Sequence, residues 1–145
     1  MSGMTQPQKP RPAISQADYQ RLSEFRYLIR RFLEFSQTQA NEAGLTPRQH
    51  QALLAIKGFP DGGPVTVGDL AERLRIRHHS AVELVNRLSE AGLVIRDQDK
   101  DDQRRVFLRL TEHAEDRLAE LSAAHIDELE RIEPMLGRLL TRHKQ

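Results

Sequence analysis

The segment 65–111 constrains the fold more than any other part of the chain. Apolar residues at helical spacing predict two short helices, at about 66–75 and 77–91. Two apolar runs follow, at 93–95 and 106–110, and the highly charged stretch between them predicts the turn of a β-hairpin. Two short helices followed by such a hairpin are the element order of a winged helix-turn-helix.

The turn of this hairpin, predicted at 96–105, holds arginines at its tip. Arg104 and Arg105, carried outward by two strands, can lie along a nucleic-acid backbone or enter a minor groove, where the negative potential is concentrated. Asp102 lies two residues before Arg104, close enough to hold that side chain through charge-assisted hydrogen bonds. A charged turn alone is more often simply solvated, so the nucleic-acid interpretation depends on the two helices that precede it.

The second of the two short helices is the candidate reading helix. Its apolar residues recur at helical spacing and predict one buried face. The residues predicted to face outward are His78, His79, Glu83, Asn86 and Arg87. Gly92 follows as the left-handed residue that ends the helix.

Long amphipathic segments flank these elements on both sides. Residues 18–43 predict one long helix that ends at Gly44, and an apolar stripe after Thr111 predicts another that extends to Pro134, with a short helix after the proline. At about 1.5 Å per residue the first helix would reach roughly 40 Å, more than a small core covers. Packing against a second copy would bury the excess, so we expect a homodimer. The alternative is that both ends pack on their own domain.

Capping signals mark several helix starts. Thr46 with Gln49, and Thr66 with Asp69, each match a capping box, in which two side chains satisfy each other's backbone N–H groups. These pairs predict that helices begin directly after Thr46 and Thr66. Thr111 is the predicted cap of the last long segment.

The composition excludes several classes of protein. The 145 residues are about one domain in length, and without cysteine the chain can form neither disulfides nor thiolate metal sites. Residues 1–17 predict a disordered tail with no secretory signal, and no later apolar run reaches membrane-spanning length. We therefore expect a cytoplasmic protein that does not associate with a membrane. A net charge of +1 also argues against a polycation that coats DNA indiscriminately.

The polar residues give little support to an enzyme. The six histidines are scattered along the chain, and His50, His113 and His125 belong to no recognisable metal-binding motif within their predicted helices. No glycine-rich phosphate loop, serine nucleophile elbow or acid pair is present. We therefore expect no catalytic residues, no metal and no cofactor, and we interpret His125, on an apolar stripe, as a core or interface residue.

Several segments, taken in order, resemble the MarR family of bacterial transcriptional regulators. They are Leu45–Gln49, Leu70–Leu74, Val85–Val94, Asp102–Arg104 and Leu108–Thr111. Each motif is common among winged helices, but the ordered set, with an Asp-x-Arg wing and a closing Leu-Thr, is more specific. The resemblance covers roughly residues 18–145.

The resemblance implies a mainly α fold with a small antiparallel β wing (α+β), a winged helix-turn-helix flanked by N- and C-terminal dimerisation helices. The implied division of the chain is a disordered tail at 1–17, a dimerisation helix at 18–45, a DNA-binding domain at 46–111 and C-terminal dimerisation helices at 112–145. A homodimer of this kind would bind a pseudo-palindromic operator in double-stranded DNA. It would act as a repressor that a small-molecule effector releases.

The resemblance also implies roles for single residues. Arg104 takes the place of the family's wing-tip arginine in the minor groove, and Asp102 that of its orienting aspartate. Arg87 falls on a position that is usually arginine, and Ser80 matches a frequent Ser or Thr near the start of the recognition helix. The complete set of predicted DNA-contacting residues is Arg77, His78, His79, Ser80, Glu83, Asn86, Arg87, Asp102, Arg104 and Arg105.

Three of these residues have alternative interpretations. Arg77 stands where the family often has Asp, and a cation there opposes the helix dipole unless an anion such as a DNA phosphate arrives. It therefore either contacts phosphate or leaves a partly frayed helix without a cap. Glu83 can accept a hydrogen bond from cytosine or pair with Arg87 one turn on, and we favour the pair. Asn86 can address adenine, but we favour a backbone contact.

A pocket for the effector is expected between the first two helices and the last long one. The candidate lining residues are Phe32, Phe35, His50 and Leu54, which are equally expected as ordinary core. The competing interpretation of the whole chain is a winged helix that docks on a protein partner without binding DNA. Binding that weakens steeply with salt would favour DNA, and a flat salt response would favour docking.

Overall fold

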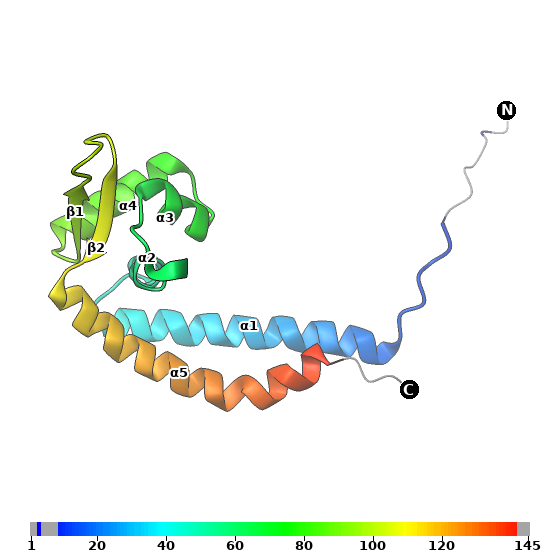
Figure 1. The fold of residues 1–145 in the computed structure, drawn as a ribbon. Helices are drawn as coiled ribbons and strands as arrows, with labels where there is room; N and C mark the ends of the chain where they lie inside the picture. Colours follow the sequence, from blue (N-terminus) through cyan, green and yellow to red (C-terminus); the bar gives the residue numbers. More distant parts are fainter. Residues whose placement is uncertain (1–2, 4–8, 142–145) are drawn as a thin grey trace.

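The computed structural model describes residue 3 and residues 9–141. Two long helices, α1 (Gln16–Glu42) and α5 (Glu112–Leu140), pack along each other, and we call them the rods. The remaining elements form a winged unit at one end of the rods, and the start of α1 and the end of α5 lie at the other (Figure 1). The elements of the winged unit are α2 (Pro47–Lys57), a 3-10 turn η1 (Pro60–Gly62), α3 (Val67–Leu74), α4 (His78–Glu90), β1 (Val94–Gln98) and β2 (Val106–Leu110).

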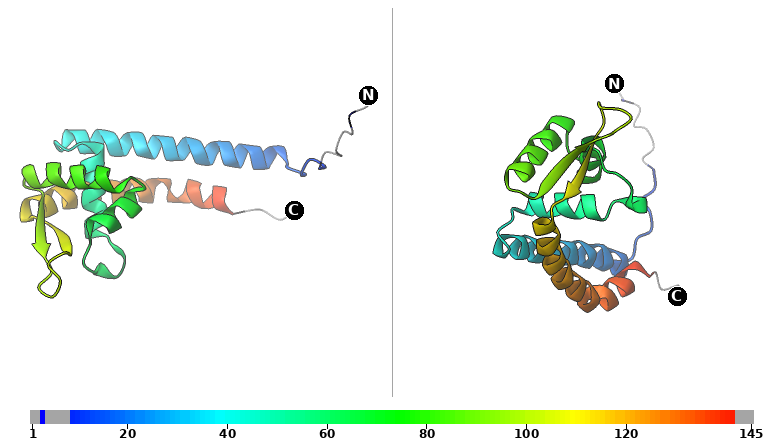
Figure 2. Two further views of the ribbon diagram at one scale, coloured as in Figure 1. Left: turned by 90° about the horizontal axis from the view of Figure 1, so that it is seen from above. Right: turned by 60° about the vertical axis from the view of Figure 1, so that its left-hand side comes forward.

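The predicted fold class is confirmed: five α-helices accompany one small antiparallel sheet in the described part of the chain. α2 lies between the rods and the rest of the winged unit (Figure 1). Viewed from above, the turn between β1 and β2 projects away from the body of the molecule (Figure 2).

Side-chain caps begin four of the helices. The capping boxes of Thr46 with Gln49 and Thr66 with Asp69 form as predicted, and the Thr111 hydroxyl accepts from the backbone N–H of Ala114. α1 begins earlier than predicted, because Ser15 caps it. The Ser15 hydroxyl accepts from the backbone N–H of Asp18 at 3.1 Å, and the Asp18 carboxylate accepts from the backbone N–H of Ser15 at 3.2 Å.

The hairpin is longer in its strands and shorter in its turn than predicted. β1 and β2 pair antiparallel from Val94 opposite Leu110 to Gln98 opposite Val106. Residues 96–98 therefore belong to a strand. Val65 adds a single bridge to Leu108 on the other edge of β2.

The prediction that α5 would stop at Pro134 is wrong, because the helix is continuous through this residue. A proline inside a helix removes one N–H donor and favours a bend, and α5 is curved (Figure 1). α5 packs along α1 both before and after this proline. Beyond the proline, the Arg21 guanidinium of α1 donates from Nε and Nη2 to the carbonyl oxygen of Leu139, at 3.1 and 2.8 Å. That carbonyl is one of those that a helix end leaves without an intrahelical partner.

The hydrophobic core lies in the winged unit and reaches α5. Its largest fully buried side chains are Leu53, Leu70, Val85 and Leu88, and α5 contributes Ala114, Leu118 and Leu121. Farther along the rods few side chains are buried, and several large apolar side chains are between 40% and 66% exposed. Those on α1 are Tyr19, Leu22, Tyr27, Ile29 and Leu33, and those on α5 are Ile126, Leu129 and Leu140. The rods therefore carry more apolar surface than this single chain covers.

None of the helices described here is both long and apolar enough to cross a membrane.

Candidate nucleic-acid interface

α4 has one buried and one exposed face. Ala81, Leu84, Val85 and Leu88 are buried, as the helical spacing predicted. The side chains predicted to face outward, His78, His79, Glu83, Asn86 and Arg87, are all exposed, and Ser80 is half-buried. The exposed face therefore presents polar and charged groups along the length of a helix, the arrangement with which a helix reads base edges in a major groove.

The start of α4 has no capping side chain. Arg77 occupies the N-cap position in extended backbone, makes no side-chain capping hydrogen bond and is exposed. The helix is nevertheless formed from His78 onward. The first N–H groups of a helix have no intrahelical partners, so this end offers donors and a nearby cation together. Contact of Arg77 with phosphate stays a prediction.

The turn between β1 and β2 holds Arg104 outward. The backbone N–H of Arg104 donates to Oδ1 of Asp102 at 3.0 Å, and the guanidinium Nε lies 3.5 Å from the same oxygen. The predicted contact between the two residues is thus present. The Arg104 side chain is 95% exposed, so the guanidinium keeps its other donors free for a ligand. The backbone N–H of Arg105 donates to the Asp102 carbonyl at 2.9 Å, and the Arg105 side chain is exposed.

Arg96 connects α4 to the hairpin, a contact that could not be predicted from the sequence. The Arg96 guanidinium of β1 donates to Oδ1 of Asn86. Asn86 is therefore held by its own protein, with its amide N–H groups still available as donors. The sequence predicts Arg96 in the turn, and only the observed strand register places it beside α4.

The predicted pair between Glu83 and Arg87 does not form. Among the described residues, neither side chain has an ion pair or hydrogen bond. An exposed i,i+4 pair gains only a few tenths of a kcal/mol, too little to hold two long side chains together. Both residues instead line a hollow of about 180 Å³ between α4 and the start of α2. Its lining residues are Thr46, Arg48, Gln49, Ser80, Glu83, Leu84 and Arg87.

Three of the four residues predicted for an effector pocket, Phe32, Phe35 and His50, gather where the rods meet the winged unit. The rings of Phe32, Phe35 and His50 all contact the ring of His125, with centroid distances of 5.8, 5.3 and 4.9 Å. The fourth predicted residue, Leu54, is 49% exposed. The sequence did not reveal the contact between His50 and His125, because the two histidines belong to helices far apart in the chain.

The two histidines differ in their hydrogen bonding. Nδ1 of His125 lies 2.6 Å from the Leu121 carbonyl oxygen, and Nε2 lies 2.9 Å from Oγ of Ser36. His50 is only 3% exposed, and its buried Nδ1 has no hydrogen-bond partner. Burial, together with the charge that His125 can carry, lowers the pKa of His50. An unsatisfied buried nitrogen costs about 1–3 kcal/mol.

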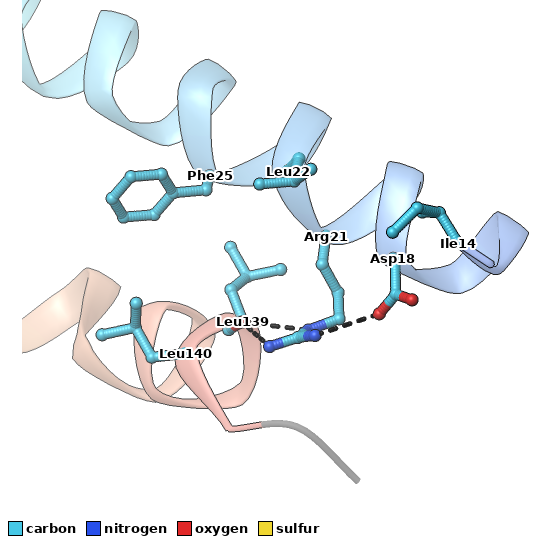
Figure 3. Close-up of a pocket in the computed structure, with 7 residues that line it drawn as sticks. All are labelled: Ile14, Asp18, Arg21, Leu22, Phe25, Leu139 and Leu140. Carbon is cyan, nitrogen blue, oxygen red and sulfur yellow. Dashed lines mark hydrogen bonds and ion pairs between the residues drawn. The ribbon is translucent and has the colours of Figure 1, made fainter. Parts of the chain in front are cut away.

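A second hollow, of about 430 Å³, lies at the far end of the rods (Figure 3). It is lined by Ile14, Asp18, Arg21, Leu22, Phe25, Leu139 and Leu140. Oδ1 of Asp18 lies 3.3 Å from Nη1 of Arg21. The Arg21 guanidinium thus lies between the Asp18 carboxylate and the Leu139 carbonyl (Figure 3). The remaining lining is mostly apolar.

Groups of three or more His, Asp or Glu side chains able to hold a metal ion are not found in the described part of the chain.

Comparison with known proteins places this geometry among transcriptional regulators. The family model described as "MarR family" matches residues 43–105. The chain is 34% identical over 98 residues to the HTH-type transcriptional regulator FarR of Neisseria gonorrhoeae, covering 68% of this chain and 65% of FarR. It is 35% identical over 107 residues to the uncharacterized HTH-type transcriptional regulator YcgE of Bacillus subtilis, covering 71% of this chain and 68% of YcgE. The chain thus spans about two thirds of the length of these relatives.

Solved structures share the fold. NadR in complex with 4-hydroxyphenylacetate superimposes with a TM-score of 0.67 at 27% identity, covering 92% of this chain and 88% of NadR. A point mutant of MepR from S. aureus, bound to an oligodeoxyribonucleotide, superimposes with a TM-score of 0.64 at 21% identity, covering 81% of this chain and 82% of MepR.

Proposed function

This chain belongs to the MarR family of transcriptional regulators, and from that premise we propose that it binds a pseudo-palindromic operator as a homodimeric repressor that a small ligand releases. The observation that carries the proposal is the placement of Arg104. It is almost fully exposed on a turn that projects from the winged unit, and Asp102 holds it there.

DNA is the partner that this surface fits. The exposed face of α4 has the form of a reading helix, and its start combines uncapped N–H groups with Arg77. A helix in the major groove brings a neighbouring wing over the adjacent minor groove, where a guanidinium is attracted by the concentrated negative potential. In this arrangement α4 contacts bases, and Arg104 enters the minor groove with its side chain already restrained by Asp102.

The exposed apolar side chains of the rods support a homodimer. Leu22 and Leu33 on α1, and Ile126 and Leu129 on α5, are among those left uncovered. A second copy related by a two-fold axis buries such surface on both partners at once. Such a dimer also presents two copies of α4 to successive major grooves, about 34–36 Å apart on one face of B-form DNA. Its operator should therefore be pseudo-palindromic.

The cluster around His125 is the proposed effector site. It joins Phe32 and Phe35 of a rod to His50 of the winged unit, so a ligand bound there would alter how the two parts are held. The unpartnered Nδ1 of His50 is a polar group that a ligand hydroxyl or carboxylate could satisfy. Action on DNA would place the protein in the cytoplasm.

The proposal is tested by selecting fragments of the source genome that the purified full chain retains. Binding to the recovered sequences is then measured by gel shift, and the number of chains bound per duplex by sedimentation. We expect a common pseudo-palindromic site that binds two chains, with Arg104→Ala weakening the complex. Recovery of no common sequence, or equal retention of unrelated DNA, would overturn the proposal.

The regulatory part of the proposal has its own test. A transcription reaction on the selected promoter should give less transcript when the protein is added. Increased transcription would show an activator and overturn the assignment as a repressor.

A further inference from the structure

We propose that Arg48, at the start of α2, contacts a phosphate of the DNA backbone beside the half-site that α4 reads. This inference rests on the proposed DNA-binding function. It adds a contact from a helix outside the helix-turn-helix pair α3 and α4, at a residue that the sequence did not single out.

The hollow between α2 and α4 supplies the geometry. Arg48 lies on its α2 side, and Ser80, Glu83 and Arg87 lie on its α4 side. Ser80 and Arg87 belong to the predicted DNA-contacting set. Arg48 therefore lies across a hollow of about 180 Å³ from residues that are already expected at the interface.

The charges in this hollow favour an anion. Arg48 and Arg87 are exposed, and within the described chain neither guanidinium makes an ion pair or hydrogen bond. Glu83 is likewise unpaired, so two cations lie near one carboxylate. A guanidinium binds a phosphate through two parallel N–H groups, which makes a phosphate oxygen pair a good match for either arginine.

The arginine, rather than the helix end, supplies the donors here. The α2 cap is already satisfied, because the Thr46 hydroxyl accepts from the Gln49 N–H at 3.1 Å and the Gln49 side chain accepts from the Thr46 N–H at 3.0 Å. The contact we infer therefore depends on the Arg48 side chain and its charge.

The position of α2 points to the DNA backbone as the source of the phosphate. A helix in the major groove has a sugar–phosphate strand on each side, and residues beside the reading face meet these strands instead of base edges. Arg48 lies at the side of that face that borders α2. A backbone contact carries no sequence information, so Arg48 should strengthen binding to every duplex equally.

The Glu83 carboxylate should repel the same phosphate. This group lines the hollow without a neutralising partner, so it repels an anion bound between Arg48 and Arg87. The replacement Glu83→Gln keeps the shape and removes the charge. We expect this variant to bind unrelated duplex DNA more tightly than the wild type does.

The test measures fluorescence anisotropy of the full chain on the selected operator and on an unrelated duplex of equal length, over a series of salt concentrations. Arg48→Ala should lower affinity about tenfold for both duplexes at low salt. It should also reduce the slope of log affinity against log salt by about 0.9, the value of one lost phosphate contact. Arg48→Lys should retain the slope, because the charge remains.

Arg26→Ala is the matched control, since Arg26 is an exposed arginine on α1 and does not line this hollow. It should leave both affinities unchanged. The melting temperature of each variant reports folding, and Arg48→Ala should not change it, because the side chain has no partner in the described structure.

Two outcomes would overturn the inference. In the first, Arg48→Ala leaves affinity and slope unchanged while Arg104→Ala weakens binding. In the second, Arg48→Ala weakens binding to the operator alone, which would indicate a base contact. If the wild type itself binds neither duplex, the proposed function fails, and that result is distinct from both.

Discussion

The rings of His50 in α2 and His125 in α5 lie 4.9 Å apart, centroid to centroid, and are tilted at 47°. The contact connects the winged unit to the rods, and Phe32 and Phe35 of α1 pack their rings against the same His125. Nδ1 of His50 is buried there without a hydrogen-bond partner. Desolvation, and secondarily the charge on His125, lowers the pKa of His50 from its ordinary value of 6.5.

This lowered pKa predicts that the protein is less stable in acid. Well above pH 6.5 His50 is neutral in the folded and unfolded states, and its contribution to stability is fully present. As the pH falls below 6.5 toward the lower folded pKa, the unfolded chain binds a proton that the folded chain does not, so the free energy of unfolding decreases. Urea unfolding at about pH 7.5 and about pH 5.5, on either side of the ordinary histidine pKa, should show this loss. The variant His50→Gln should reduce it.

The matched control is His113→Gln, which removes an exposed histidine from α5. It should retain the pH dependence of the wild type. If His50→Gln retains the full pH dependence as well, the buried ring is not its cause.

The hydrogen bonds from Arg21 of α1 to the Leu139 carbonyl of α5 predict a local effect at the end of α5. Arg21→Ala removes both hydrogen bonds to the Leu139 carbonyl (Figure 3) and should destabilise this end by about 1 kcal/mol. Amide hydrogen exchange should accelerate in the last turns of α5 and stay unchanged in α4. Arg26→Ala, on an exposed arginine of the same helix, should accelerate neither region.

The apolar surface of the rods predicts how the dimer can be separated. Leu129→Asp places a charge on a side chain that is already 46% exposed in one chain, so the subunit should remain folded. In a dimer the same charge would be buried against the partner, at a large cost in free energy. Sedimentation should show monomers for Leu129→Asp and dimers for Leu129→Met. A Leu129→Asp variant that stays dimeric would exclude this face from the interface.

The contact between Asp102 and Arg104 predicts that removal of Asp102 weakens DNA binding less than removal of Arg104 does. Asp102→Ala frees the Arg104 side chain, which must then lose more rotamer freedom on binding. Affinity for the operator should fall severalfold, less than it falls for Arg104→Ala. Asp101→Ala removes the same charge from the neighbouring residue and should increase affinity slightly, because one repulsive carboxylate is gone. Equal loss from Asp102→Ala and Arg104→Ala would instead indicate that Asp102 shapes the whole turn.

The short-range features of the fold could be predicted from the sequence because neighbouring residues determine them. The capping boxes of Thr46 and Thr66 depend on residues three positions apart. The buried face of α4 follows from helical spacing in the same way. The Asp102–Arg104 contact also lies within one turn, which is why the tip of the wing was predictable.

The features that were missed depend on contacts between distant segments. α5 continues past Pro134 and packs along α1, where Arg21 satisfies the Leu139 carbonyl, a contact 118 positions apart in the chain. Arg96 reaches Asn86 only because of the strand register. The pairing of His50 with His125 likewise requires that two helices meet.

The central claim, that α4 and the Arg104 wing bind duplex DNA, is tested most directly by the salt dependence of affinity for the selected operator. For the wild type we expect log affinity to fall linearly and steeply with log salt, because each neutralised phosphate releases counterions. For Arg104→Ala we expect weaker binding and a slope smaller by about one. A flat salt response that Arg104→Ala leaves unchanged would contradict the account and favour a winged helix that docks on protein.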